Sequence, residues 1–128
     1  MRKKVYSGAP WEKKAAYSRA TRVRDLVFVS GTAAFDENGQ LVGRGNMFEQ
    51  SDYSFAKIGR ALEQCGASIE NVVRTRSFVR DMSDFDEYAR AHRKHFEGID
   101  PVSTCVQVGG FVDPDMLVEI EVDAVIDG

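Results

Sequence analysis

The chain has 128 residues, which predicts a single domain over residues 1–128 with one hydrophobic core. Hydrophobic residues make up 43% and charged residues 29%, as is ordinary for a globular protein, and no apolar run approaches the roughly 20 residues of a membrane span. The net charge of −3 argues against a general nucleic-acid-binding protein, which usually carries a strongly basic face.

The cysteine content and the N-terminal residues predict that the protein is located in the cytoplasm. The basic segment Met1–Lys4 is followed by polar rather than apolar sequence, so we expect no secretion signal. Cys65 and Cys105 lie in segments that predict a helix and a strand. In a cytoplasmic protein these two thiols are expected to be free.

The first third of the chain predicts three strands. Residues 3–7 predict a short edge strand, and residues 18–24 and 26–34 predict two strands around a turn at Arg24-Asp25. Asn38-Gly39 then supplies the positive backbone angles that a tight turn requires.

From Asn46 the apolar residues recur every three or four positions, which predicts an amphipathic helix. Asn46 is expected to cap this helix and Gly66 to end it. Its buried face is predicted to consist of Met47, Ser51, Phe55, Ile58, Leu62 and Cys65.

The order of the remaining elements predicts an α+β fold. Residues 72–80 are rich in β-branched side chains and predict a strand, and Ser83 or Asp84 is expected to cap a second helix. One face of that helix is predicted to carry Phe85, Tyr88, His92, Phe96 and Ile99. We therefore expect a mixed sheet with two helices packed on one face, while the other face is polar or meets another subunit.

Two final strands each gather polar groups on one side. Side chains alternate between the faces of a strand, so Ser103 and Cys105 share one side of residues 102–108. Glu119, Glu121 and Asp123 share one side of residues 118–124, opposite an apolar face. Three acids on one strand face require solvent, a partner subunit or a ligand.

These strands carry motifs that resemble the Rid/YjgF family of reactive-intermediate (enamine and imine) deaminases. Residues 101–108 and 118–124 are similar to the end of the family pattern, residues 16–20 and 26–31 to its opening, and residues 72–81 to its central strand. The resemblance covers residues 3–126. It implies a chorismate-mutase-like fold and a homotrimer with a ligand cleft between subunits.

The resemblance also implies roles for individual residues. Glu119 matches the family's acid that positions or activates the attacking water, although a solvated strand acid is the alternative. Tyr17 and the Ser30-Gly31 turn match cleft residues that could donate hydrogen bonds to a small polar ligand. Cys105 matches a position that lines the cleft mainly through its backbone amide.

Trp11 and the two histidines have simpler alternatives. Trp11 precedes Tyr17 and could close the cleft mouth or anchor the N-terminal segment. His92 and His95 have a spacing that could support a metal on a helix, yet no cysteine or acid lies at metal-site spacing nearby. We expect neither a metal nor another cofactor.

Ser103 is the main departure from the family pattern. The deaminating members have an arginine here, which grips the substrate carboxylate with paired hydrogen bonds worth roughly 1.5–3 kcal/mol. Ala89 likewise replaces the family's helix asparagine, and Arg76 is a candidate to supply the missing charge. We expect ligand binding at Ser103 but weak action on 2-aminoacrylate.

The favoured function is therefore hydrolysis of an enamine or imine to a carbonyl compound and ammonia. The partners expected are a small imine, enamine or related carbonyl ligand and two further copies of the chain, with no membrane and no nucleic acid. The main alternative is a non-catalytic trimer that binds a small molecule or a protein. A third hypothesis is RNA cleavage or inhibition of translation, because family members have been given these labels. This sequence, however, contains no RNA-stacking motif.

Overall fold

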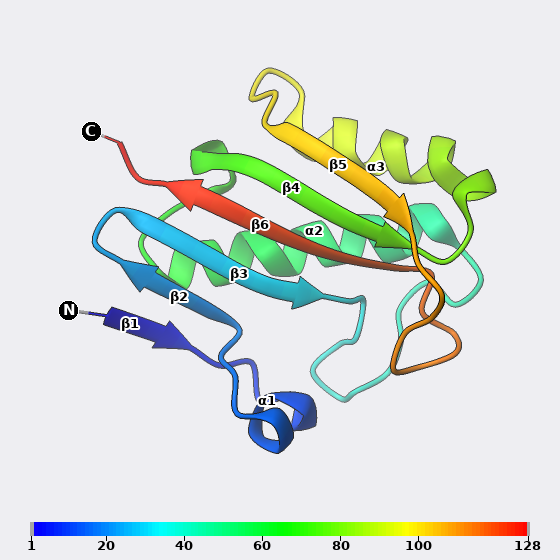
Figure 1. Cartoon of the computed structure of the whole chain (residues 1–128), viewed down its shortest axis with the longest axis horizontal. Coiled ribbons are helices and arrows are strands. Elements are labelled where there is room, and N and C mark those ends of the chain that lie inside the picture. The colour runs from blue at the N-terminus through cyan, green and yellow to red at the C-terminus, as the bar shows by residue number, and fades with distance from the viewer. Residues whose placement is uncertain (1, 128) are drawn as a thin grey trace.

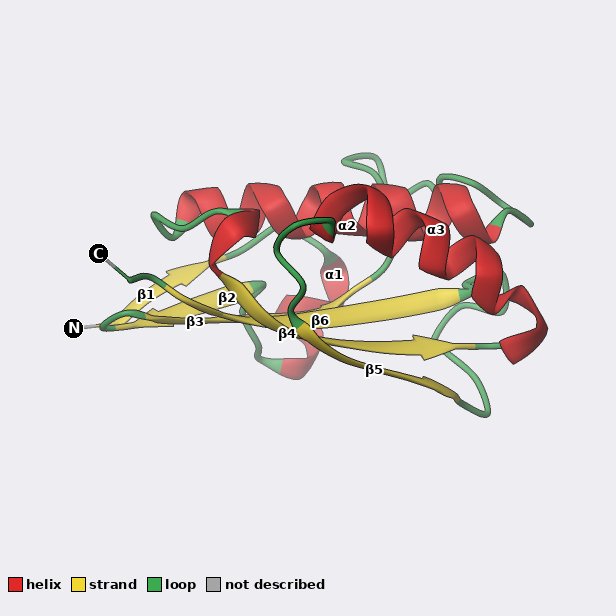
Figure 2. Ribbon diagram, turned by 90° about the horizontal axis from the view of Figure 1, so that it is seen from above, coloured by secondary structure: helices red, strands yellow, loops and turns green. Residues whose placement is uncertain are grey.

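A six-stranded mixed sheet runs through the molecule, and its two long helices lie on one of its faces (Figures 1 and 2). The computed structural model describes residues 2–127. The strands, in spatial order, are β1 (Arg2–Val5), β2 (Ala20–Val23), β3 (Leu26–Thr32), β6 (Val118–Val125), β4 (Val72–Val79) and β5 (Val102–Gln107). Only β4 and β5 are parallel, and the other neighbours are antiparallel. The predicted α+β class is confirmed.

The helices are α1 (Pro10–Ala15), α2 (Met47–Gln64) and α3 (Phe85–Phe96), with short 3-10 turns at Ile69–Asn71 and Met82–Asp84. Asn46 caps α2 as predicted, because its side chain accepts the N–H of Glu49 at 3.0 Å. Gly66 follows the helix with a φ of +81°, the left-handed backbone that glycine adopts without strain. The short helix α1, which begins at Pro10, was not predicted.

Of the two caps predicted for α3, Asp84 occupies the N-cap position, although its side chain forms no capping hydrogen bond. Ser83 lies inside a 3-10 turn that leads directly into α3. A side-chain capping bond is found at that turn instead, where Asp81 accepts the N–H of Ser83 at 2.9 Å.

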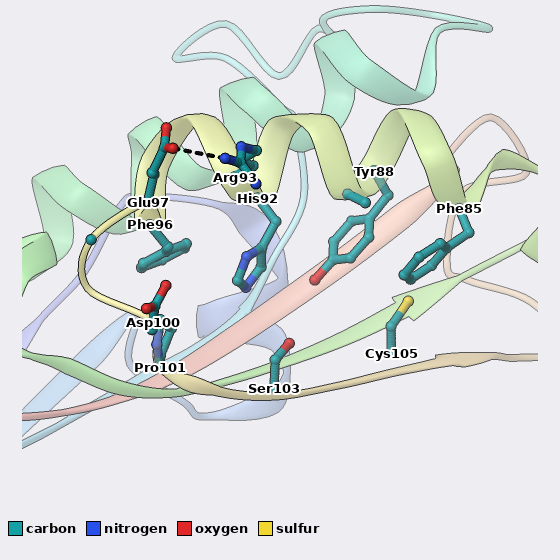
Figure 3. A pocket seen from close by; sticks show the side chains of 12 residues that line it. Phe85, Tyr88, His92, Arg93, Phe96, Glu97, Asp100, Pro101, Ser103 and Cys105 are labelled. Atoms are coloured by element: carbon teal, nitrogen blue, oxygen red, sulfur yellow. Dashed lines mark hydrogen bonds and ion pairs between the residues drawn. The ribbon is translucent and has the colours of Figure 1, made fainter.

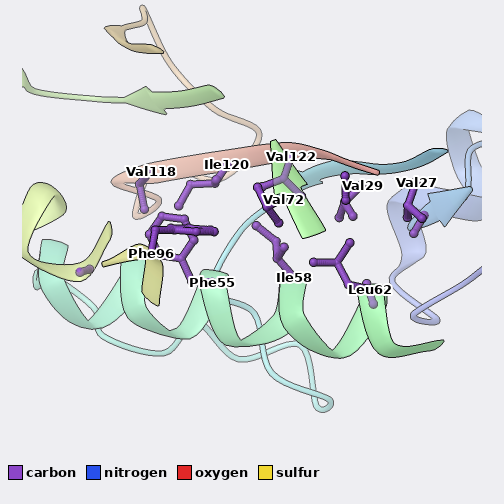
Figure 4. Close-up of a cluster of buried hydrophobic side chains, with 14 of the residues drawn as sticks. Val27, Val29, Phe55, Ile58, Leu62, Val72, Phe96, Val118, Ile120 and Val122 are labelled. Carbon is purple, nitrogen blue, oxygen red and sulfur yellow. The ribbon is translucent and has the colours of Figure 1, made fainter. Parts of the chain in front are cut away.

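The core lies between α2, α3 and the covered face of the sheet (Figure 4). Phe55, Ile58 and Leu62 of α2 are fully buried against apolar side chains of β3, β4 and β6. All six residues predicted for the buried face of α2 are buried. The 3.6-residue period thus identified the face correctly.

The opposite face of the sheet, here called the open face, is left largely uncovered by α2 and α3 (Figure 2). Leu26, Phe28, Val102 and Val106 are each more than 40% exposed on it. In its centre the Arg76 guanidinium meets two acids of β6, described below. A sheet face with both apolar and charged side chains needs solvent or another protein surface against it.

Two expectations from composition concern the cysteines and membranes. Cys65 and Cys105 are both free thiols. Among residues 2–127, no helix combines the length and the apolar character that crossing a membrane requires.

Gln50 ties the segment before β6 to α2. Its buried side-chain amide donates to the carbonyls of Gly43 (3.2 Å) and Asp115 (3.1 Å) and accepts the N–H of Leu117 at 2.9 Å. One side chain thus satisfies three backbone groups in a region closed to water. This fixes the start of β6, two residues before Glu119.

We predict that Gln50→Ala lowers the free energy of unfolding by about 3 kcal/mol, because it leaves buried backbone groups without partners. Gln64→Ala, at an exposed position of the same helix, is the control and should change it by less than about 0.5 kcal/mol. Urea unfolding at a fixed protein concentration measures both. Equal stabilities of the two variants would contradict the assigned role of Gln50.

Candidate functional site

The residues expected in the site fall into two groups on opposite faces of the sheet. Glu119 lies on the open face with Gly31 beside it. Ser103 and Cys105 project from the other face of β5 toward α3, as the alternation predicted (Figure 3). One chain therefore does not bring Glu119 and Ser103 together.

Glu119 differs from the other two acids of β6. Glu121 and Asp123 both bind Arg76, at 2.6 and 3.0 Å, whereas no hydrogen bond or ion pair formed within residues 2–127 involves the Glu119 carboxylate. Burial raises the pKa of Glu119, Arg19 opposes this shift, and Glu121 reinforces it. A carboxylate with a raised pKa and no partner is suited to accepting a proton near neutral pH.

Gly31 provides the space that Glu119 occupies. A Cβ atom at Gly31 would lie 2.9 Å from the Glu119 Cδ and 3.0 Å from its Oε2, so the carboxylate would have to move. A larger residue at position 31 would therefore displace the Glu119 carboxylate from its present place. The match between Gly31 and the family pattern thus has a physical reason in this chain.

Arg19 is a site residue that sequence reasoning missed. Its guanidinium is buried, donates from Nη1 to the Gly31 carbonyl (2.9 Å) and the Thr32 hydroxyl (3.2 Å), and lies 3.4 Å from a Glu12 carboxylate oxygen. It also lies 5.8 Å from the centre of the Tyr17 ring. Arg19 thereby links Tyr17, Gly31 and Glu119. The motif at residues 16–20 contained it, but the sequence does not distinguish a buried arginine from a surface one.

The remaining predicted residues on this side have more limited roles. The Ser30 hydroxyl donates to the Ser18 carbonyl at 2.7 Å, so its hydrogen is used within the chain and only its oxygen can receive a ligand. Tyr17 is 37% exposed and lines the same hollow as Ser30. Trp11 lies on α1 and is 39% exposed. We call Tyr17, Arg19, Ser30, Gly31 and Glu119 the Glu119 cluster.

A second site lies between α3 and β5, in a cavity of about 810 Å³ (Figure 3). We call it the hydroxyl groove. Its lining includes Phe85, Tyr88, His92, Phe96, Ser103 and Cys105. The aromatic side chains descend from one face of α3, as predicted, and the two small polar side chains rise from β5.

A polar network forms the floor of the hydroxyl groove. Thr75 of β4 is fully buried and donates its hydroxyl to the Ser103 Oγ at 2.7 Å, and its Oγ1 lies 2.9 Å from the His92 Nε2. Ser77 and Tyr88 share a further hydrogen bond. Burial lowers the pKa of His92 and raises that of Tyr88 to about 12, so both side chains are uncharged at neutral pH.

Cys105 is not equipped as a nucleophile. Burial raises the pKa of its thiol, and a nucleophilic cysteine needs a nearby base or cation that lowers it. This agrees with the interpretation that the residue lines the groove.

Within one chain, Arg76 is not placed to supply a positive charge beside Ser103. Arg76 pairs with Thr104 across the β4–β5 register, so its side chain lies on the open face, opposite to Ser103. Its charge is already compensated by Glu121 and Asp123, which hold its pKa above the usual value. Within one chain, Ser103 therefore has no substitute cation from this position.

The two histidines of α3 serve different partners. His95 lies 2.7 Å from Asp52 of α2, whereas His92 is bonded to Thr75 of the sheet. Within residues 2–127, no three His, Cys, Asp or Glu side chains lie together as a metal site would require.

Comparisons with known proteins agree with this architecture. The Endoribonuclease L-PSP family pattern matches residues 8–126. An uncharacterized protein of Streptomyces coelicolor is 38% identical over 95% of this chain and 90% of its own length. The 3-aminoacrylate deaminase RutC of Acinetobacter baylyi is 34% identical over 83% of each chain.

A solved structure shows the same fold. The crystal structure of a YjgF/YER057c/UK114 family member from Mycobacterium tuberculosis is 36% identical and covers 98% of this chain and 100% of its own, with a TM-score of 0.90. The resemblance seen in the motifs is thereby confirmed: this chain belongs to the Endoribonuclease L-PSP family, the group also called Rid/YjgF.

Proposed function

We propose that this protein hydrolyses an enamine or imine in a cleft between two subunits of a homotrimer. One subunit would supply the Glu119 cluster and its neighbour the hydroxyl groove. The main support for this proposal is that the residues that match the family pattern lie on opposite faces of one sheet: Glu119 lies on the open face and Ser103 on the other. A second chain is needed to bring Ser103 opposite Glu119, and the apolar residues of the open face favour such packing.

The Glu119 carboxylate fits the proton transfers of this reaction. It takes a proton from water as the water oxygen attacks the carbon of the protonated imine, which forms a neutral carbinolamine. It then gives this proton to the amino nitrogen and takes the proton of the carbinolamine hydroxyl as the C–N bond breaks, so that a carbonyl compound and ammonia leave. The raised pKa of Glu119 makes it a stronger base than an ordinary carboxylate.

The relatives support deamination, and Ser103 argues for a different substrate. RutC of Acinetobacter baylyi is named a 3-aminoacrylate deaminase, which makes C–N hydrolysis the first activity to test. The groove of this chain has a serine where the deaminating pattern has arginine. The same substitution favours the alternative of a trimer that binds a small molecule or protein without turnover.

Ribonuclease action, which the family name suggests, has less support. His92 and His95 are engaged with Thr75 and Asp52, so they do not form an acid–base pair over one groove. We further propose that the protein works in the cytoplasm, where its two free thiols would persist.

We predict that the protein sediments as a trimer of 14.3 kDa chains. The expected result at micromolar concentration is a single species of about three times the chain mass, because burial of the open face stabilises association. Analytical ultracentrifugation measures it. A stable monomer would remove the shared cleft and with it the proposed site.

We predict that Glu119→Gln abolishes the deaminase activity while leaving the trimer and its melting temperature nearly unchanged. The rate of ammonia release from screened imines measures it. In the unchanged protein, kcat/KM should rise with pH through a pKa above 4.5 as Glu119 loses its proton. Glu121→Gln is the matched control, because it keeps a hydrogen-bonding group for Arg76 and should retain turnover. It also removes a negative charge that raises the Glu119 pKa, so the rise of kcat/KM with pH should occur at a lower pH. Full turnover by Glu119→Gln would show that Glu119 has no catalytic function.

We predict that Gly31→Ala impairs the same reaction, because the added Cβ would overlap the Glu119 carboxylate. Gly59→Ala in α2, where an added Cβ would meet no atom within 4 Å, is the matched control and should retain activity. Unchanged kcat/KM in Gly31→Ala would show that the position of the carboxylate is unimportant.

We predict that 2-aminoacrylate is hydrolysed at least about tenfold more slowly than by a relative with arginine at the position of Ser103, since a charged hydrogen bond of about 1.5–3 kcal/mol is missing. Ammonia release from freshly generated imine measures both rates. Comparable rates would show that another cation anchors the carboxylate.

A further inference from the structure

We infer that the hydroxyl groove recognises an uncharged hydrogen-bond-accepting group, such as a carbonyl or amide oxygen, through a donor chain that runs from His92 through Thr75 to Ser103. This inference deepens the proposed function and rests on it, because the groove is taken as one wall of the ligand cleft. It names the class of ligand that the groove selects.

The direction of the chain follows from hydrogen counting. Thr75 has one hydroxyl hydrogen and donates it to the Ser103 Oγ. The bond between Thr75 and His92 therefore uses the hydrogen on the His92 Nε2, and this ring nitrogen is the donor. Thr75 does not use the Ser103 hydroxyl hydrogen, so Ser103, which is exposed on the groove side of β5, can donate it to the Tyr88 hydroxyl or to a ligand. Each donation polarises the next O–H bond, which makes Ser103 a better donor.

The charges around the groove disfavour a carboxylate. Arg93 is the cation on its lining, and its Nη2 lies 2.8 Å from a Glu97 oxygen. Asp100 adds a negative charge, while His92 and Tyr88 are uncharged at neutral pH. An anionic ligand would gain no uncompensated cation from this wall. A neutral acceptor can accept the hydrogen of the Ser103 hydroxyl and avoids the desolvation of a charge.

The rest of the groove fits an apolar group. Phe85 is 41% exposed at one end of the lining, and Phe96 forms part of it farther along α3. Aromatic faces bury apolar surface at little cost in side-chain entropy. A ligand with a neutral carbonyl next to an apolar group therefore matches both parts of the groove.

The test compares two isosteric probes, 2-phenylacetamide and phenylacetate, by titration of the ¹⁵N-labelled full-length protein at neutral pH. We expect the amide to shift the resonances of residues 92, 103 and 105 and to bind at least about tenfold more tightly than the carboxylate. Ser103→Ala should weaken binding of the amide about fivefold, as expected for one neutral hydrogen bond of about 1 kcal/mol. Ser103→Arg should reverse the preference. Thr104→Ala, on the opposite face of β5, is the matched control and should bind as the unchanged protein does.

Three results would overturn the inference: equal or tighter binding of phenylacetate, unchanged binding of the amide by Ser103→Ala, or absence of binding by both probes. Ser103 is exposed, so a preserved spectrum away from the groove shows that its variants fold. The titration involves no turnover. Glu119→Gln should still prefer the amide, so a failure of the catalytic proposal and a failure of this one give different results.

Discussion

The placement of every candidate residue depends on strand β6, which joins the two halves of the sheet by pairing with β3 on one side and β4 on the other. Val118, Ile120 and Val122 are fully buried under the helices, so the residues between them must face the other way. A slip of one residue would place acids in the core and valines outside it, at a prohibitive cost. Glu119 is thus held in place by the packing of its neighbours rather than by contacts of its own carboxylate.

The parallel pairing of β4 and β5 determines the hydroxyl groove in the way that β6 determines the position of Glu119. The chain leaves β4, crosses over through α3 and returns as β5, which places Thr75 beside Ser103 and both below His92. Buried hydroxyls are tolerated there because they bond to one another, since an unpaired one would cost about 1–3 kcal/mol. The helix that covers the core therefore also forms the roof of a polar site. Fold and site share the same elements.

Much of this fold follows from local patterns in the sequence, and the site follows only in part. Periodicity identified α2 and the faces of β5 and β6 because those patterns repeat within one element. The short helix α1 has too few residues to show a period, and the same is true of the 3-10 turn that precedes α3. The bonds from Thr75 to His92 and Ser103 join residues 17 and 28 positions apart, so they depend on strand order and register. The role of Arg19 likewise depends on burial that tertiary packing creates.

The location of Ser103 has a consequence for the history of such a protein. β5 is an edge strand of the sheet, and Ser103 is exposed on it, whereas its partner Thr75 is fully buried. Exchanges at exposed strand positions usually change stability by less than about 0.5 kcal/mol, while exchanges in the core are far more costly. Mutation can therefore alter the residue that meets the ligand without a loss of folding. Descendants of one ancestral chain can acquire new substrates at this position while the strand order and the core remain the same.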